Sequence, residues 1–227
     1  YNNWVDVREI IITDAVFRDA TVNWQETEKR IKTKMDFSKL TIVQGFIGGD
    51  LNGNTTTLGR EGSDFTAGIF AYCLDAESLT IWKDVLGVLN ADPGEFKEVQ
   101  LLEHISYEET IEMAFYGASV IHPKTIKPIQ NKKIPLIVRS FKNLNSPGTK
   151  VSEGVTLEPT IPCFIIKKNQ VLVSISSLDF SFIVEENISD IFKLFHKYQL
   201  KVNLIQNSAI SFSVCVDNNL NHFDLFY

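Results

Sequence analysis

The chain has 227 residues, of which 44% are hydrophobic and 22% charged, and its formal net charge is −6. This length accommodates one large domain or two ordinary ones, and the composition excludes a chain that is disordered over most of its length. The acidic balance argues against a nucleic-acid-binding protein, which needs a basic face.

Cysteine usage and hydropathy narrow the class further. Cys73, Cys163 and Cys215 are widely spaced and form no CxxC motif, which is typical of reduced thiols in a cytoplasmic protein. No apolar run reaches the roughly 18 residues of a membrane span, so no membrane partner is expected. We also expect no metal site formed by the protein alone.

The patterns of apolar and turn residues predict an α/β domain over residues 1–150. Ser106, followed by Glu109, forms a capping-box pattern that opens a helix ending at Gly117, and another helix begins near Pro123. The other expected elements are strands at 4–7, 10–13, 40–44, 78–82 and 134–139, and helices at 24–32 and 65–74. Strands alternating with helices imply ligands at the carboxyl ends of the strands.

A smaller α+β domain is expected over residues 151–227, after a polar turn at 143–149. Its amphipathic helix, at 188–198, carries apolar residues on one face. Strands are expected at 163–166, 171–175, 202–205 and 210–214. The predicted order is therefore β-β-α-β-β.

Residues 45–64 predict an anion-binding site. This segment is rich in glycine and threonine and lies between an expected strand and an expected helix. Free backbone N–H groups and the helix dipole converge at such a helix N-terminus. Arg60 adds a planar guanidinium that suits carboxylate or phosphate. The expected ligand is an acidic substrate, a phosphoryl group, or both.

Several motifs appear in an order and at a spacing that resemble those of aspartokinases, the aspartate branch of the amino-acid kinase family. They are Gly45–Gly48, Thr55–Arg60, Gly62–Asp64, Trp82–Gly87, Ala91–Pro93 and Tyr116–Pro123. The resemblance implies a partial three-layer α/β/α kinase sandwich followed by an ACT-like, ferredoxin-like regulatory domain. It also implies ATP-dependent phosphorylation of the L-aspartate β-carboxylate to 4-phospho-L-aspartate, the first step toward lysine, threonine and methionine.

The same resemblance assigns roles to individual residues. Arg60 would hold the α-carboxylate of L-aspartate and Asp64 would organise the active site, so these two are the catalytic candidates. Phe46, Thr57 and Ser63 would line the aspartate pocket with Arg60. The residues expected on the ATP and Mg²⁺ side are Lys83, Asp84, Leu89, Asp92 and Ser119. The substrate carboxylate is already a nucleophile, so positioning and charge neutralisation suffice and no general base is required.

Four positions depart from the family pattern. Glu61 replaces a glycine, Lys83 a threonine, Gly94 an arginine and Ser119 a lysine, so two cations are lost and one is gained. The family's N-terminal strand with its phosphate-contacting lysine has no counterpart in these residues. We therefore expect a piece of a longer protein that is inactive as given, since a missing charge-stabilising lysine costs orders of magnitude in rate.

The C-terminal region is expected to bind an amino-acid effector (lysine, threonine or methionine) and to form a homodimer through ACT domains. Ala209 stands where lysine-sensitive members carry an acidic residue, which argues against lysine. The expected effector-binding residues are Asn187, Ile188, Val202, Asn203 and Ser208.

Two alternatives remain open. The chain could be a non-catalytic amino-acid-sensing fragment or degenerate kinase, or an amino-acid kinase acting on glutamate, carbamate or a nucleotide. The motifs and the C-terminal module favour the aspartate branch over the latter. His122 is expected to cap a turn or helix, and the basic stretch 124–133 to be a solvated helix face.

Overall fold

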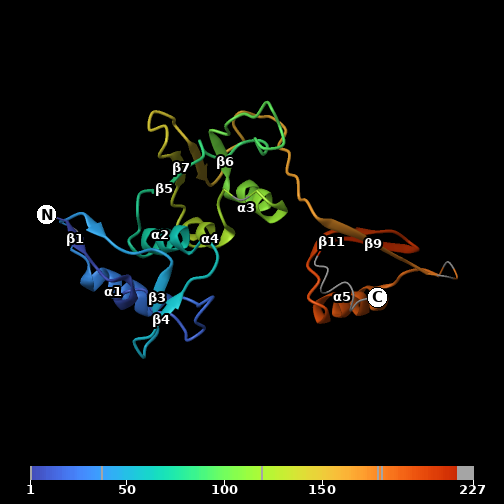
Figure 1. The fold of residues 1–227 in the computed structure, drawn as a ribbon, viewed down its shortest axis with the longest axis horizontal. Helices are drawn as coiled ribbons and strands as arrows, with labels where there is room; N and C mark the ends of the chain where they lie inside the picture. The colour runs from blue at the N-terminus through green and yellow to red at the C-terminus, as the bar shows by residue number, and fades with distance from the viewer. Residues whose placement is uncertain (1, 37, 119, 178, 180, 219–227) are drawn as a thin grey trace. The chain divides into compact units, whose positions relative to one another are not determined.

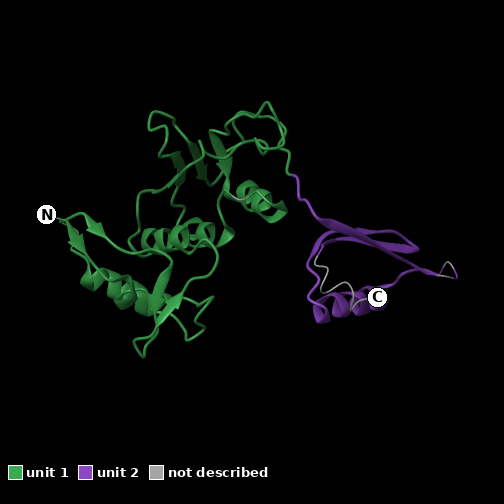
Figure 2. Ribbon diagram, in the orientation of Figure 1, with its two compact units in different colours: residues 1–165 green, residues 166–227 purple. Residues whose placement is uncertain are grey.

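The computed structural model describes residues 2–36, 38–118, 120–177, 179 and 181–218. The chain divides into two compact units, residues 1–165 and 166–227 (Figure 2). Each has a hydrophobic core of its own. No helix among the described residues is long and apolar enough to cross a membrane.

The first unit alternates short strands with helices (Figure 1). Its elements are β1 (Asn3–Trp4), the 3₁₀ helix η1 (Val7–Glu9), α1 (Trp24–Lys34), β2 (Thr41–Ile42), β3 (Ile47–Gly49), β4 (Thr55–Thr57), α2 (Gly62–Cys73), β5 (Leu79–Lys83), β6 (His104–Ser106), α3 (Tyr107–Tyr116), α4 (Pro123–Asn131), β7 (Leu136–Ser140) and β8 (Thr149–Ser152). The main sheet has the order β5-β7-β8-β6, in which β5 and β7 are parallel and β7 and β8 antiparallel.

Apolar side chains of the sheet and of the helices form the largest core. Ile81, Leu136 and Val138 from β5 and β7 pack with Ile126 and Ile129 from α4. The three strand residues alternate with partly exposed neighbours, as expected of strands with one buried face. Helix α2 therefore lies between this core and a second cluster that contains Ile31 of α1 and Ile69 of α2.

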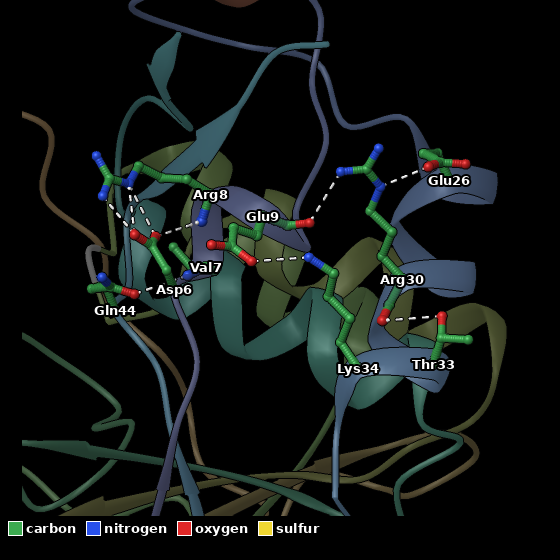
Figure 3. Close-up of polar contacts among 9 residues, drawn as sticks. All are labelled: Asp6, Val7, Arg8, Glu9, Glu26, Arg30, Thr33, Lys34 and Gln44. Carbon is green, nitrogen blue, oxygen red and sulfur yellow. Dashed lines mark hydrogen bonds and ion pairs between the residues drawn. The ribbon is translucent and has the colours of Figure 1, made fainter. Parts of the chain in front are cut away.

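Polar contacts fix α1 against η1 (Figure 3). Arg30 donates from Nη1 to the Glu9 carbonyl oxygen at 3.1 Å and from Nε to Glu26 at 2.6 Å. Lys34 Nζ lies 2.9 Å from Glu9 Oε2. At the other end of α1, the Asn23 side chain caps the helix by accepting a hydrogen bond from the Glu26 N–H.

The second unit contains β9 (Gln170–Ser176), α5 (Glu185–Lys197), β10 (Val202–Asn207) and β11 (Ser211–Asp217). The strands form an antiparallel sheet of order β10-β11-β9. Phe212, Val214 and Val216 of β11 point to one face, where they pack with Phe195 of α5. The alternation of buried and half-buried residues along β11 follows the two-residue period of a strand.

Two expected strands are not formed. Residues 163–166 make only an isolated bridge, between Phe164 and Ala91, so the unit has the order β-α-β-β rather than β-β-α-β-β. Phe164 instead stacks on Phe96 with ring centroids 5.6 Å apart. Residues 10–13 form isolated bridges, and Ile10, Ile11 and Ile12 are buried as loop residues. Their apolar run reflects burial, which a strand and a buried loop share.

The first unit extends past residue 150, where the sequence placed the domain boundary. Strand β8 crosses that position and pairs with both β6 and β7. Farther along, the Phe164 N–H donates to the Asn90 carbonyl oxygen at 2.7 Å. The segment that follows β8 is thus bonded to the first unit up to Phe164.

Candidate functional site

The glycine-rich segment folds back on the N-terminus of α2. Phe46 has a positive φ of 76°, and its N–H donates to Thr66 Oγ1 at 3.0 Å. A Cβ placed on Gly62 would lie 2.6 Å from Phe46 Cδ2, and one on Gly45 would lie 3.1 Å from Ser63 Oγ. Glycine at these two positions therefore permits the close approach of residues 45–46 to the first turn of α2.

A hairpin of β3 and β4, which the sequence analysis did not predict, carries Thr57. The Asp50 carboxylate organises its turn by accepting hydrogen bonds from the Asn52 and Asn54 N–H groups, at 2.9 and 2.7 Å. The hydrogen bond from the Asn54 side chain lowers the Asp50 pKa most, and the two backbone bonds add to this effect. Thr57 Oγ1 donates to the Phe17 and Arg18 carbonyl oxygens. Its single proton is used there, so toward a ligand Thr57 can only accept.

Arg60 and Ser63 present free polar groups to solvent. Both are exposed, and neither side chain makes a hydrogen bond or ion pair with any other described residue. Between them, Glu61 adopts the left-handed conformation with φ 53° and starts the helix without a side-chain cap. The first N–H groups of α2 therefore remain available next to Arg60, as expected of an anion site at a helix N-terminus.

Asp64 forms an ion pair with Lys83 that the sequence did not predict. Lys83 Nζ lies 2.9 Å from Asp64 Oδ2, and the two side chains are 21% and 19% exposed. Lys83 ends β5, while Asp64 lies in the first turn of α2. The pair thus places a cation at the carboxyl end of the parallel strand β5, at the first turn of the helix that follows Arg60.

The remaining nucleotide-side candidates lie on the loop after β5 or beyond. Asp84 is 3.8 Å from Lys142 Nζ with both side chains about two-thirds exposed. Leu89 is half-buried and bridges Leu101. Asp92 is exposed, and its Oδ1 accepts from the Gly94 N–H at 2.8 Å, as in a turn. No hydrogen bond or ion pair joins Asp84, Leu89 or Asp92 to Asp64, and Ser119 lies outside the described residues.

Of two features near the loop, the structure agrees with the sequence-based expectation for His122 and differs from it for the basic stretch. His122 caps α4 by accepting from the Lys124 N–H at 3.1 Å, as expected. The basic stretch is more than a solvated face, because Lys124 pairs with Asp19 next to Gly59, and Lys132 pairs with Asp75 at 2.5 Å. The Asp19 partner was not identifiable, since it lies 105 residues away in sequence.

The predicted effector residues make contacts within the second unit. Asn187 accepts from the Val184 N–H at 3.0 Å, and Ser208 Oγ lies 2.7 Å from Ser211 Oγ in the β10–β11 turn. Ile188 and Val202 pack against the core. The remaining effector candidate, Asn203, belongs to a polar cluster with Lys167, Gln170 and Asp217.

Asn203 is the centre of a cluster of four polar side chains on β9, β10, β11 and the segment before β9. Its amide donates to Asp217 Oδ1 at 2.7 Å and to Gln170 Oε1 at 2.6 Å, and accepts from Lys167 Nζ at 2.6 Å. Burial raises the Asp217 pKa, but bonds from Gln170, Lys167 and Asn203 outweigh it and lower the pKa to about 2. The Asn203 amide is therefore already engaged by its own fold.

Comparisons with known proteins identify relatives of the chain. Residues 2–140 match the model of the amino acid kinase family. The chain is 34% identical over 221 residues to the chloroplastic bifunctional aspartokinase/homoserine dehydrogenase 2 of Arabidopsis thaliana, covering 93% of this chain and 24% of that protein.

Solved structures of aspartokinase III from Escherichia coli have the same fold. The complex with lysine and aspartate matches with a TM-score of 0.79 and 31% identity, covering 96% of this chain and 49% of that one. The complex with aspartate and ADP matches with a TM-score of 0.77 at 31% identity, covering 95% of this chain and 49% of that one. The chain thus spans about half the length of these structures and about a quarter of the Arabidopsis protein.

Proposed function

This chain belongs to the amino acid kinase family, and we propose on that basis that it carries part of the active site of an aspartate kinase. The resemblance to aspartokinases expected from the motifs is confirmed by relatives that are 31–34% identical over nearly the whole chain. The proposed reaction is ATP-dependent phosphorylation of the L-aspartate β-carboxylate to 4-phospho-L-aspartate.

The acidic substrate would bind at the N-terminus of α2. The single observation that supports this most is the pair of unengaged polar side chains there, Arg60 and Ser63, on either side of a helix start that has no side-chain cap. Arg60 would grip the α-carboxylate through two N–H groups, and Ser63 would donate from its hydroxyl. Thr57 and Phe46 would form the wall. The aspartokinase III structures that contain aspartate are consistent with this assignment.

Lys83 would provide a cation for the phosphoryl group. It lies at the carboxyl end of β5 with its charge partly balanced by Asp64, which would also fix its position. Asp84, Leu89, Asp92 and Ser119 would contribute to the nucleotide side. ADP bound to aspartokinase III supports the choice of nucleotide.

Mg²⁺ would reach this site with ATP. Among the described residues no group of three or more His, Cys, Asp or Glu side chains could hold a metal ion. A site with few protein ligands fits Mg²⁺, because this ion is commonly held by substrate phosphates and only one or two carboxylates. Asp84 is the exposed carboxylate closest in sequence to Lys83 and would be the protein ligand. When bound, Mg²⁺ neutralises phosphate charge.

The chemical step requires positioning rather than acid–base catalysis. An oxygen of the β-carboxylate attacks the γ-phosphorus, the bond from phosphorus to the bridging oxygen of ADP breaks, and its electron pair stays on ADP. No proton is transferred. Lys83 would stabilise the charge that spreads over the transferred oxygens, while Arg60 holds the substrate by its α-carboxylate; such stabilisation is worth most where water is excluded.

The second unit would act as an ACT-like regulatory domain that binds an amino-acid effector and forms homodimers. One aspartokinase III structure contains lysine. In this chain Asn203 is held in the cluster with Asp217, and Ala209 has no charge, so an effector would contact chiefly backbone groups around Asn187, Ile188, Val202 and Ser208. The alternative is a non-catalytic amino-acid-sensing protein. Gly94 and Ser119 favour this alternative, because they stand where the family pattern has an arginine and a lysine.

A titration of the full-length protein with MgATP and L-aspartate tests the proposal, with trapping of aspartyl phosphate by hydroxylamine. A kinase binds MgATP and forms the hydroxamate only with aspartate present. Binding of lysine, threonine or methionine without any binding of MgATP would establish the sensor instead. Glutamate replacing aspartate serves as the matched control for substrate choice.

A further inference from the structure

A pocket of about 330 Å³ opens between α1, α2 and α4 of the first unit. It is lined by Trp24, Phe65, Tyr72, Lys124, Lys127, Pro128 and Asn131. None of these residues belongs to the proposed aspartate and nucleotide sites. The volume lies at the lower end of the roughly 300–1,000 Å³ range of small-molecule pockets, so it suits a ligand with a single ring system.

Aromatic side chains form one wall. The Trp24 ring meets the Tyr72 ring edge to face with centroids 5.0 Å apart, and the Phe65 ring at 6.4 Å. Trp24 is the first residue of α1, and the Asn23 side chain caps this end of the helix. Arg30 and Lys34 hold α1 against η1 (Figure 3). Such a rigid aromatic wall favours a flat apolar group, which would find edge and face contacts there.

Cationic and amide groups of α4 form the polar part of the lining. Lys124, Lys127 and Asn131 follow one another on α4 at spacings of three and four residues, so they share one helix face. Lys124 is paired with Asp19, whereas Lys127 is exposed and has no ion-pair partner in the described part of the chain. No lining residue is acidic. The polar side of the pocket therefore suits a carboxylate, which Lys127 would pair with and the Asn131 amide would donate to.

We propose that this pocket is a binding site for a small aromatic carboxylate, with the ring against Trp24, Tyr72 and Phe65 and the carboxylate at Lys127 and Asn131. The pocket joins three helices, each of which also contributes side chains to a hydrophobic core of the first unit. Occupation would therefore tie α1, α2 and α4 together, and above Kd the thermal stability should rise with the logarithm of the ligand concentration.

Phenylacetate is a suitable probe, with phenylacetamide and cyclohexylacetate as controls that remove the charge and the aromatic ring. Calorimetric titration of the protein should give saturable binding of phenylacetate, and each control should bind at least about threefold more weakly, given the modest strength of an exposed ion pair. Equal binding of phenylacetamide would overturn the proposed carboxylate contact, and no binding of phenylacetate would overturn the site.

Substitutions then locate the site. Lys127→Met should weaken phenylacetate binding about three- to fivefold, whereas Lys29→Met, at an exposed lysine of α1 outside the pocket, should leave it unchanged. Tyr72→Leu should weaken binding with little change in charge. Equal effects of Lys127→Met and Lys29→Met, or displacement of phenylacetate by L-aspartate, would place the ligand elsewhere. Light scattering measures the mass of the protein in solution as a last check. If a second copy covered the pocket, the mass would be that of a dimer and phenylacetate would not bind.

Discussion

Lys83 at the end of β5 and Asp64 in the first turn of α2 form an ion pair of 2.9 Å that joins two elements of the first unit. Replacing Lys83 by Met leaves Asp64 four-fifths buried without a counterion. We expect Lys83→Met to lower the free energy of unfolding by about 1 kcal/mol. Asp64→Asn, made in the otherwise unchanged chain, should lower it by less. A double-mutant cycle by urea denaturation measures the coupling. Lys142→Met, at the exposed pair with Asp84, is the control and should have almost no effect.

Arg60→Ala should raise the KM for L-aspartate by about tenfold or more without lowering Tm, because the guanidinium makes no bond to the described residues. Arg60→Lys keeps the charge but loses the two-pronged geometry, so it should recover only part of the affinity. Steady-state kinetics of the full-length protein with varied aspartate checks both. An unchanged KM in Arg60→Ala would show that the α-carboxylate binds elsewhere.

Gly62→Ala should destabilise the first unit by about 1–3 kcal/mol, because the added methyl group would overlap Phe46 and overpacking outweighs the helix preference of alanine. Phe46→Ala removes the nearest contacting atom. The cost of Gly62→Ala should therefore fall when Phe46 is also alanine, as measured by thermal unfolding of the four variants. Additive costs would mean that the Phe46 side chain is not what excludes the methyl group.

The second unit should lose stability in acid. The pKa of Asp217 is lowered from 3.8 to about 2 in the folded protein, so its carboxylate stabilises the fold above about pH 4. That contribution declines as the pH falls through about 2. Amide hydrogen exchange in β9 and β11, measured between pH 2 and 5, should show progressive loss of protection. Asp217→Asn should flatten this dependence, and Asp190→Asn, at an exposed carboxylate of α5, is the control that should leave it nearly unchanged.

Longer helices and their caps were predictable from local signals. Ser106 and Glu109 form the expected capping box, Gly117 ends the helix with φ 122°, and His122 caps α4. These features depend on residues within one turn of each other, which a sequence displays directly.

The short strands and the ion pairs were not predictable. Strands β3, β4 and β6 have three residues each, too few to show a two-residue period. The motifs placed Asp64 and Lys83 in a kinase site, but no local pattern indicates that they pair, since the contact depends on how α2 lies against β5. The same applies to Asn203. The sequence analysis expected its amide to bind an effector, whereas in the structure this amide donates to Asp217.

The left-handed backbone at Glu61 lowers the stability of the protein, while the side chain adds a negative charge beside Arg60. A non-glycine residue in this conformation costs roughly 1 kcal/mol, and the buried Glu61 Oε2 has no hydrogen-bond partner among the described residues. Glycine would relieve both costs. A chain that keeps glutamate here holds an unfavourable carboxylate beside Arg60, where it would repel a second anion and attract an ammonium group. Glu61→Gly should therefore raise Tm while weakening discrimination between amino-acid and simple dicarboxylate ligands.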